Sequence, residues 1–260
     1  MSGRFNVVPN RKPRLPVMVT QGKTPYGLEI IENCLACPVR QDRIFCNLSP
    51  EGVQRLDEIT TTAVYPKGAT LFVQGQVGHG VFILCTGRVK LSTSSSDGKT
   101  LILKIADPGD LLGLPATISG RPYEASADVL EPCQANFIHS ADFLNFLRDF
   151  GEAAVRVAQE LGAKYQSALE ELKNIGLSRS TSEKLARFLL DWTARQARGG
   201  EPLRATLALT HEEIAQMIGA SRETVTRLFA EFKRKNLLEI KGSSFLIKDK
   251  AALEEIVAGA

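Results

Sequence analysis

Residues 209–235 read LTHEEIAQMIGASRETVTRLFAEFKRK, and this stretch decides the fold of the carboxyl-terminal part of the chain. Thr210 and Glu213 have the spacing of a capping box, which satisfies free backbone N–H groups at the start of a helix. Gly219 supplies the permissive backbone that a tight turn needs, and Ser221 is a favourable cap for a second helix. The stretch therefore predicts a helix-turn-helix.

Both predicted helices have apolar residues at helical spacing, so each presents one face to a core. The inward residues are Ile214, Met217 and Ile218 in the first helix and Val225, Leu228, Phe229 and Phe232 in the second. Four polar side chains then point outward near the start of the second helix, where such helices meet base edges in a DNA major groove. They are Arg222, Glu223, Thr226 and Arg227. The simpler alternative is a helical hairpin with a solvated charged face.

The net charge of the chain does not by itself indicate nucleic-acid binding, because 32 Lys and Arg residues oppose 29 Asp and Glu residues. Residues 221–250, however, hold eight basic and four acidic residues, so positive charge is concentrated in this segment. Lys233, Arg234 and Lys235 are placed to meet DNA phosphates, which position a domain without specifying sequence.

The segment SRETVTR at 221–227 resembles the recognition helix of the CRP/FNR superfamily of bacterial transcription regulators. The segment NLLEIKGSSFLI at 236–247 is similar to the wing of that family, a hairpin that would turn at 241–243. The resemblance implies that Glu223 and Arg227 read the shared core of each half-site. Arg can bind guanine O6 and N7 together, and Glu can accept a hydrogen bond from cytosine N4.

The predicted recognition helix mixes two branches of the family. Arg222 matches the CRP branch, whereas Thr226 keeps the hydroxyl that FNR-type proteins carry before the final Arg. The expected DNA-binding residues are Ser221, Arg222, Glu223, Thr226, Arg227 and Lys233. The resemblance implies a homodimer that binds a palindromic site in double-stranded DNA, and RNA polymerase as a further partner.

Upstream, residues 63–140 contain short apolar runs separated by glycine-containing turns, a pattern typical of a compact antiparallel roll or jelly roll. Three segments in it resemble the cyclic-nucleotide-binding fold of the superfamily: YPKG at 65–68, CTGRVKL at 85–91 and PGDLLG at 108–113. With them, the resemblance covers roughly residues 34–250.

A long helix is expected from about Glu152 to Ile175. Its predicted seam alternates spacings of four and three, as in a coiled coil: Ala154, Ala158, Leu161, Tyr165, Ala168, Leu172 and Ile175. The pattern alone also allows a core helix packed on its own domain, and the family resemblance favours a dimer helix. Residues 178–182 read as the hinge that follows it.

Cyclic nucleotide binding is disfavoured by one segment. In cAMP-binding members an Arg-Ser pair with a nearby Glu cradles the cyclic phosphate, and the Arg supplies the opposite charge. At the corresponding place this chain has Tyr123, Glu124 and Ala125, and a carboxylate there would repel a phosphate. Arg121 could serve only through a shifted loop.

Three cysteines are clustered ahead of the expected roll: Cys34, Cys37 and Cys46. In a reducing compartment such a cluster indicates metal or redox chemistry rather than disulfides. The spacing resembles the amino-terminal cluster of FNR-type oxygen sensors, although the last gap is longer than in the best-known type. The resemblance implies a [4Fe-4S] cluster with one further cysteine from the roll, since such clusters take four thiolates.

The fourth ligand is open between two cysteines. Cys133 lies in the right region and is the preferred candidate, although it is offset from the family's ligand position. Cys85 falls in a strand-like run, where a cysteine is more often a small core residue. Structural zinc and a thiol switch or vestigial motif are the alternatives to a cluster.

The predicted fold class is α+β: a cyclic-nucleotide-binding-type β-roll, a long dimerisation helix and a winged helix-turn-helix. The expected divisions are an extension over 1–33, a cysteine segment and sensory roll over 34–150, the helix over 151–178 and the DNA-binding domain over 179–260. The chain contains neither a membrane-length apolar run nor a signal-peptide core, so a cytoplasmic protein is expected.

No catalytic motif is present, so an enzyme is not expected. The predicted function is a DNA-binding regulator that responds to oxygen or redox state. The alternative is a regulator of the same fold gated by a cyclic nucleotide, or by nitric oxide through haem, with the cysteines incidental.

Overall fold

The computed structural model describes most of the chain beyond the first 25 residues. The described ranges are 26–28, 30–37, 40–176, 180–196, 204–206, 209–241 and 244–258. Most of the expected extension over 1–33 therefore lies outside the described residues. Within the described residues, no helix is long and apolar enough to cross a membrane.

Eight strands form the β-roll as two antiparallel sheets, with strand orders β1-β8-β3-β6 and β2-β7-β4-β5. The strands are β1 (Thr61–Tyr65), β2 (Thr70–Phe72), β3 (Gly80–Leu84), β4 (Arg88–Ser94), β5 (Thr100–Ala106), β6 (Leu111–Leu112), β7 (Ser126–Glu131) and β8 (Cys133–His139). Every residue of β3 is buried, which explains its continuous apolar sequence GVFIL. The predicted roll is confirmed.

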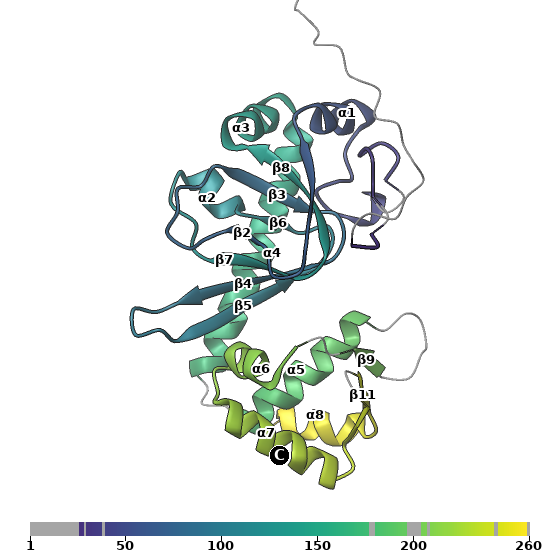
Figure 1. Ribbon diagram of the computed structural model, residues 1–260, viewed down its shortest axis with the longest axis vertical. Coiled ribbons are helices and arrows are strands. Elements are labelled where there is room, and N and C mark those ends of the chain that lie inside the picture. The colour runs from purple at the N-terminus through teal and green to yellow at the C-terminus, as the bar shows by residue number, and fades with distance from the viewer. Residues whose placement is uncertain are drawn as a thin grey trace, which may run out of the picture.

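Helices lie around the roll (Figure 1). They are the short 3-10 helix η1 (Arg40–Asp42), α1 (Pro50–Glu58), α2 (Leu114–Ser119), α3 (Ser140–Asp149) and α4 (Gly151–Gly176). A buried cluster joins α1, α3 and α4 to the sheet that contains β3 and β8. We call it the upper core, and its largest residues are Phe45, Phe143 and Phe146.

The long helix α4 has 26 residues, as expected, but its exposed face differs from the predicted seam. Ala153 and Val157 are buried in the upper core, and Leu161 packs against them. The exposed face therefore shares Ala158 and Tyr165 with the predicted seam, but not Ala154 or Leu161, which are partly buried. It carries Val155, Ala158, Gly162, Tyr165 and Leu169, which keep the three-four spacing of a coiled coil. The side chains of Leu172 and Ile175 lie outside the described residues.

The carboxyl-terminal domain is a winged helix-turn-helix. It contains α5 (Thr181–Gln196), β9 (Arg204–Thr206), α6 (His211–Ile218), α7 (Arg222–Arg234), β10 (Leu238–Lys241), β11 (Ser244–Ile247) and α8 (Lys250–Ala258). The wing hairpin β10–β11 is present and pairs with β9. Residues 242–243 of the predicted turn, and 178–179 of the expected hinge, lie outside the described residues.

The predicted turn chemistry is confirmed. Thr210 and Glu213 form both bonds of a capping box at the start of α6. Gly219 ends that helix with φ of 65°, a conformation that a residue with a Cβ adopts at a cost. The Ser221 side chain accepts a hydrogen bond from the backbone N–H of Thr224 and so caps α7.

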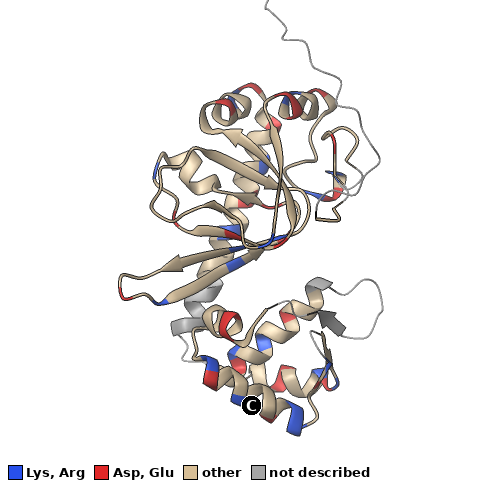
Figure 2. Ribbon diagram, in the orientation of Figure 1, with Lys and Arg blue, Asp and Glu red and all other residues tan. Residues whose placement is uncertain are grey.

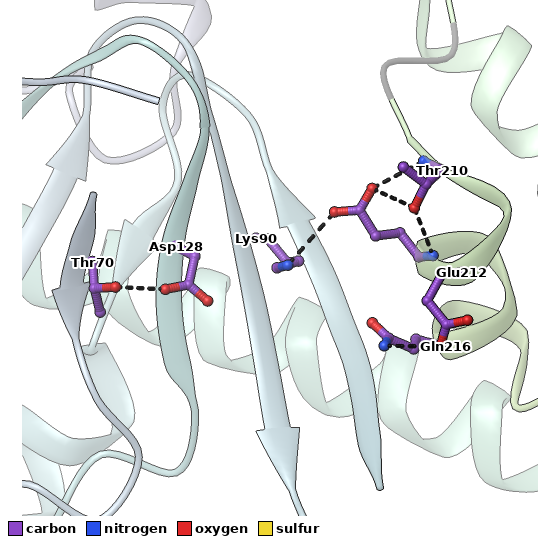
Figure 3. Close-up of polar contacts among 7 residues, drawn as sticks. Thr70, Lys90, Asp128, Thr210, Glu212 and Gln216 are labelled. Atoms are coloured by element: carbon purple, nitrogen blue, oxygen red, sulfur yellow. Dashed lines mark hydrogen bonds and ion pairs between the residues drawn. The ribbon is translucent and has the colours of Figure 1, made fainter. Parts of the chain in front are cut away.

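The DNA-binding domain lies beneath β4 and β5 and packs against them (Figures 1 and 3). Ile102 and Ile105 of β5 are buried in the same cluster as the interior of the helix-turn-helix. The Lys90 ammonium lies 3.6 Å from the carboxylate of Glu213, the residue that also closes the capping box. The Arg88 guanidinium stands 5.7 Å from the centre of the Trp192 ring. This docking was not predicted from the sequence.

Candidate functional site

The outward face of α7 is the first candidate site. Arg222, Glu223, Thr226 and Arg227 are all exposed near the start of this helix. Its opposite face is buried through Val225, Leu228, Phe229 and Phe232, as the apolar spacing predicted. Among the described residues no ion pair engages Arg222, Glu223 or Arg227, so their charges are available to a partner.

Two further residues extend this face. Ser221, the cap, is exposed at one end of α7, and Lys233 is exposed in its last turn. Figure 2 shows charged residues at both ends of the helix. Basic side chains at such separate points can contact phosphates on either side of a groove.

His211 of α6 contacts two residues of α7, Thr226 and Phe229. This support was not predicted from the sequence. The ring of His211 stacks on Phe229 with centroids 4.9 Å apart and an interplanar angle of 3°. Its Nδ1 lies 3.0 Å from the Thr226 hydroxyl, which itself donates to the carbonyl of Arg222. The Thr226 side chain is therefore held in one orientation at the centre of the exposed face.

The second candidate site is a pocket in which four cysteines meet. Cys34, Cys37 and Cys46 come from the segment before α1, and Cys85 comes directly after β3. The pocket has an empty volume of about 400 Å³, including the space that opens to solvent. Its other lining residues are Ile31, Arg40, Arg43, Val53, Leu56, Ile83 and Asn136.

The structure places the two candidates for the fourth cysteine in different surroundings. Cys133 is fully buried in the interior of the roll, together with Ala135. Alternate residues of a strand face opposite sides of a sheet, so Gln134 and Asn136 of β8 point instead toward the cysteine segment. Cys85, not Cys133, is the cysteine of the roll that lines the pocket.

Polar contacts hold the cysteine segment on the roll and on helix α1. The Gln134 side-chain amide pairs with the backbone of Ile31, accepting from its N–H and donating to its carbonyl, both at 2.8 Å. The backbone N–H of Cys34 donates to the Asp57 carboxylate at 2.9 Å. The Arg43 guanidinium donates to the carbonyl of Cys85 at 3.0 Å. These contacts place the thiols of the segment opposite Cys85.

Burial raises the pKa of three of the four thiols, because it removes water from around the charged thiolate form. Burial raises the pKa of Cys34 to about 12, and the neighbouring Asp57 carboxylate raises it further. Burial also raises the pKa of Cys85 to about 12 and that of Cys46 to about 11, although the charge of Arg43 opposes both shifts. A thiolate in this pocket therefore needs a positive partner such as a metal.

The four cysteines of the pocket supply the type of donor that an iron–sulfur cluster takes. Among the described residues, no three His, Cys, Asp or Glu side chains come close enough to share one metal ion. In a [4Fe-4S] cluster each thiolate binds a different iron, so the four sulfurs surround a larger group. Four soft thiolate donors around one pocket match that requirement.

The segment expected to replace a phosphate cradle is part of the core. Tyr123 is buried, its ring stacks on Phe72 with centroids 4.1 Å apart, and its hydroxyl donates to the carbonyl of Gly80 at 3.0 Å. Arg121 and Glu124 are exposed. Tyr123 is therefore a core residue of the roll, whereas its neighbours Arg121 and Glu124 are not.

Two family models match the chain. Residues 62–150 match the cyclic nucleotide-binding domain, and residues 183–256 match the Crp-like helix-turn-helix domain. The chain belongs to the CRP/FNR family of transcription regulators. This order of domains agrees with the roll and the winged helix-turn-helix seen in the structure.

Relatives in this family are named for different regulatory roles. The chain is 28% identical over 211 residues to a CRP-like cAMP-activated global transcriptional regulator of Mycobacterium tuberculosis, covering 81% of this chain and 94% of that protein. It is 27% identical over 235 residues to the transcriptional activator protein FnrA of Stutzerimonas stutzeri, covering 88% and 93%. The solved structure of FixK2 from Bradyrhizobium japonicum has the same fold, with a TM-score of 0.69 and 21% identity over 78% of this chain and 99% of that one.

Proposed function

We propose that this CRP/FNR regulator binds a palindromic DNA site as a homodimer, and that a [4Fe-4S] cluster held by Cys34, Cys37, Cys46 and Cys85 makes this binding sensitive to oxygen or redox state. The observation that carries the proposal is the meeting of Cys85 with the three amino-terminal cysteines in one pocket. These four residues are separated by up to 51 positions in the sequence, so local chain geometry does not explain their proximity.

The DNA-binding part rests on the exposed face of α7. In this proposal Arg227 binds guanine and Glu223 accepts from cytosine in the major groove. Ser221, Arg222 and Thr226 contact neighbouring groups, and Lys233 contacts a phosphate. Thr226 is held by His211, so its hydroxyl is presented in a fixed position.

The homodimer rests on the exposed stripe of α4. Val155, Tyr165 and Leu169 are large apolar residues left exposed on a helix whose other face is already buried. Gly162 lies in the middle of the stripe, where a glycine destabilises a helix by about 1 kcal/mol relative to alanine. Space is open around it, and its missing side chain would let a partner helix approach closely.

The cysteine segment is connected directly to α4. Ser49, which caps α1 three residues after Cys46, donates from both its backbone N–H and its hydroxyl to the Glu152 carboxylate at the start of α4. Phe45 and Leu48 are buried against Ala153 and Val157 of the same helix. A change in the cysteine segment can therefore alter the position of the helix that carries the dimer stripe.

When bound, the cluster would supply four iron–sulfur bonds that tie the cysteine segment to the roll. Residues of the chain supply the other contacts. Gln134 and Arg43 hold the cysteine segment in place. The hydrogen bond from Ser49 to Glu152 couples the position of this segment to that of α4. The protein with a bound cluster then favours the dimer. Loss of the cluster shifts the population toward a state with weaker DNA binding.

Gating by a cyclic nucleotide is the competing function, because relatives such as the M. tuberculosis regulator are named as cAMP-activated. The buried Tyr123 opposes it in this chain. The test is the affinity for a palindromic operator, measured on protein purified without oxygen, after exposure to air, and with cAMP. We expect tight binding only without oxygen and no effect of cAMP. Equal binding in air, or binding that requires cAMP, contradicts the proposal.

A further inference from the structure

Asn136 on β8 is a buried polar residue whose side chain reaches into the cysteine pocket. Its Nδ2 lies 3.5 Å from the sulfur of Cys34, a hydrogen-bonding distance for sulfur. Its Oδ1 accepts a hydrogen bond from the Thr62 hydroxyl at 3.0 Å, directly across the β1–β8 pair. The contact with Thr62 fixes the amide so that its NH₂ group, not its oxygen, faces the sulfur.

The register of the sheet also brings Asn136 near Cys85, because Asn136 pairs with Ile83, two residues before Cys85. The sulfur of Cys85 lies 3.7 Å from the carbonyl oxygen of Ile83. Asn136 and Cys85 therefore line the same pocket. The side chain of Gln134, two residues earlier on the same face, pairs instead with the backbone of Ile31.

Donors aimed at sulfur stabilise the more negative state of a thiolate-bound cluster. Hydrogen bonds to the sulfurs are among the factors that set the reduction potentials of iron–sulfur clusters. Residues outside the ligand set often control the properties of a metal site in this way. An N–H group near sulfur makes removal of an electron less favourable, because the electron leaves a group that the donor stabilises.

We propose that Asn136 is a positioning residue that holds the sulfur of Cys34 with its side-chain N–H donor and thereby slows oxidation of the bound cluster in air. The step that it slows is the transfer of one electron from the cluster to dioxygen, which becomes superoxide. This inference rests on the proposed function, since it requires that the cluster be bound.

The test compares Asn136→Leu with the wild type after anaerobic cluster assembly. Leu has a similar volume and lacks the donor. The variant therefore removes the hydrogen bond to the sulfur of Cys34. We expect equal iron per chain, about threefold to tenfold faster loss of visible absorbance in air, and a lower reduction potential.

Two matched variants separate an effect on the oxidation of the cluster from a loss of attachment of the cysteine segment. Thr62→Val frees the Asn136 amide to rotate, so we expect a smaller acceleration in the same direction. Gln134→Leu removes an attachment that touches no sulfur, so we expect less cluster loaded but an unchanged rate of loss per loaded cluster. If Asn136→Leu does not load, the Thr62→Val rate decides the question.

Each outcome distinguishes the inference from the function that it rests on. A wild type that binds no cluster rejects both. A wild type that binds the cluster, with Asn136→Leu and Thr62→Val losing it at the wild-type rate and potential, overturns the role of Asn136 and leaves the proposed function standing.

Discussion

The DNA-reading helix and the cysteine pocket are built in opposite ways. The helix-turn-helix is local: its caps, its turn glycine and its apolar faces lie within residues 209–235. The pocket is assembled from a segment before α1 and from strands β3 and β8, which meet only in the folded roll. The first kind of site can be recognised from neighbouring residues, whereas the second depends on the register and sidedness of the sheet.

The largest effect is expected when the two cysteines of the roll are each replaced by serine. Cys85→Ser should lose nearly all bound iron, because a hydroxyl is a poor substitute for a soft thiolate. Cys133→Ser should retain iron, since Cys133 lies in the interior of the roll and away from the pocket. Iron analysis of the anaerobically purified variants measures both. Retention by Cys85→Ser with loss by Cys133→Ser would restore the sequence-based choice and reject the pocket.

In the DNA-reading helix, single substitutions should remove single contacts with DNA. Arg227→Ala should weaken binding to a specific operator about 10-fold to 100-fold, which is the range for loss of a bidentate contact to guanine. Lys233→Ala should instead weaken binding to all sequences and reduce the salt dependence by about one unit. Fluorescence anisotropy with specific and scrambled DNA checks both. Uniform weakening by Arg227→Ala would show that it contacts only phosphates.

A charged substitution in the exposed stripe of α4 should prevent dimer formation. Gly162→Glu should convert the protein to monomer at micromolar concentration, because it places a charge and a side chain where a second helix approaches. Ala163→Glu is the matched control, since Ala163 is exposed on the same helix but outside the stripe. Light scattering after size exclusion measures both. Dimers in both variants would move the interface away from the stripe.

The smallest effect is expected at a helix cap. Ser221→Ala should lower the free energy of unfolding of the DNA-binding domain by about 1 kcal/mol, because the N–H of Thr224 loses its acceptor. Ser221→Asp should preserve the cap in the free protein but place a negative charge near DNA. Thermal unfolding and DNA affinity separate the two roles. Equal stability of all three proteins would show that the cap contributes little.

The same contrast explains what the sequence could predict. Thr210, Gly219 and Ser221 act through groups within a few residues, so their roles were predicted correctly. Cys133 was chosen by its position in the chain, but β8 turns it into the roll while Asn136 faces the pocket. The choice between them is decided by which face of the sheet is covered.

The predicted seam of α4 coincides only in part with the exposed stripe, for a related reason. Helical periodicity identifies an apolar stripe, but it does not say which of two apolar faces packs on the same chain. Leu161 packs on the upper core, and Gly162 lies on the exposed stripe in its place. The docking of Lys90 and Ile105 against the DNA-binding domain could also not be predicted from the sequence pattern, because it joins residues that lie far apart in the sequence.

The most direct test of the central claim is the iron and acid-labile sulfide content of the wild-type protein purified without oxygen. Four thiols around one pocket predict close to four irons and four sulfides per chain, with a brown colour that is lost in air. Colourless protein without iron, or protein that holds one zinc ion per chain, would contradict the claim that these cysteines carry the signal.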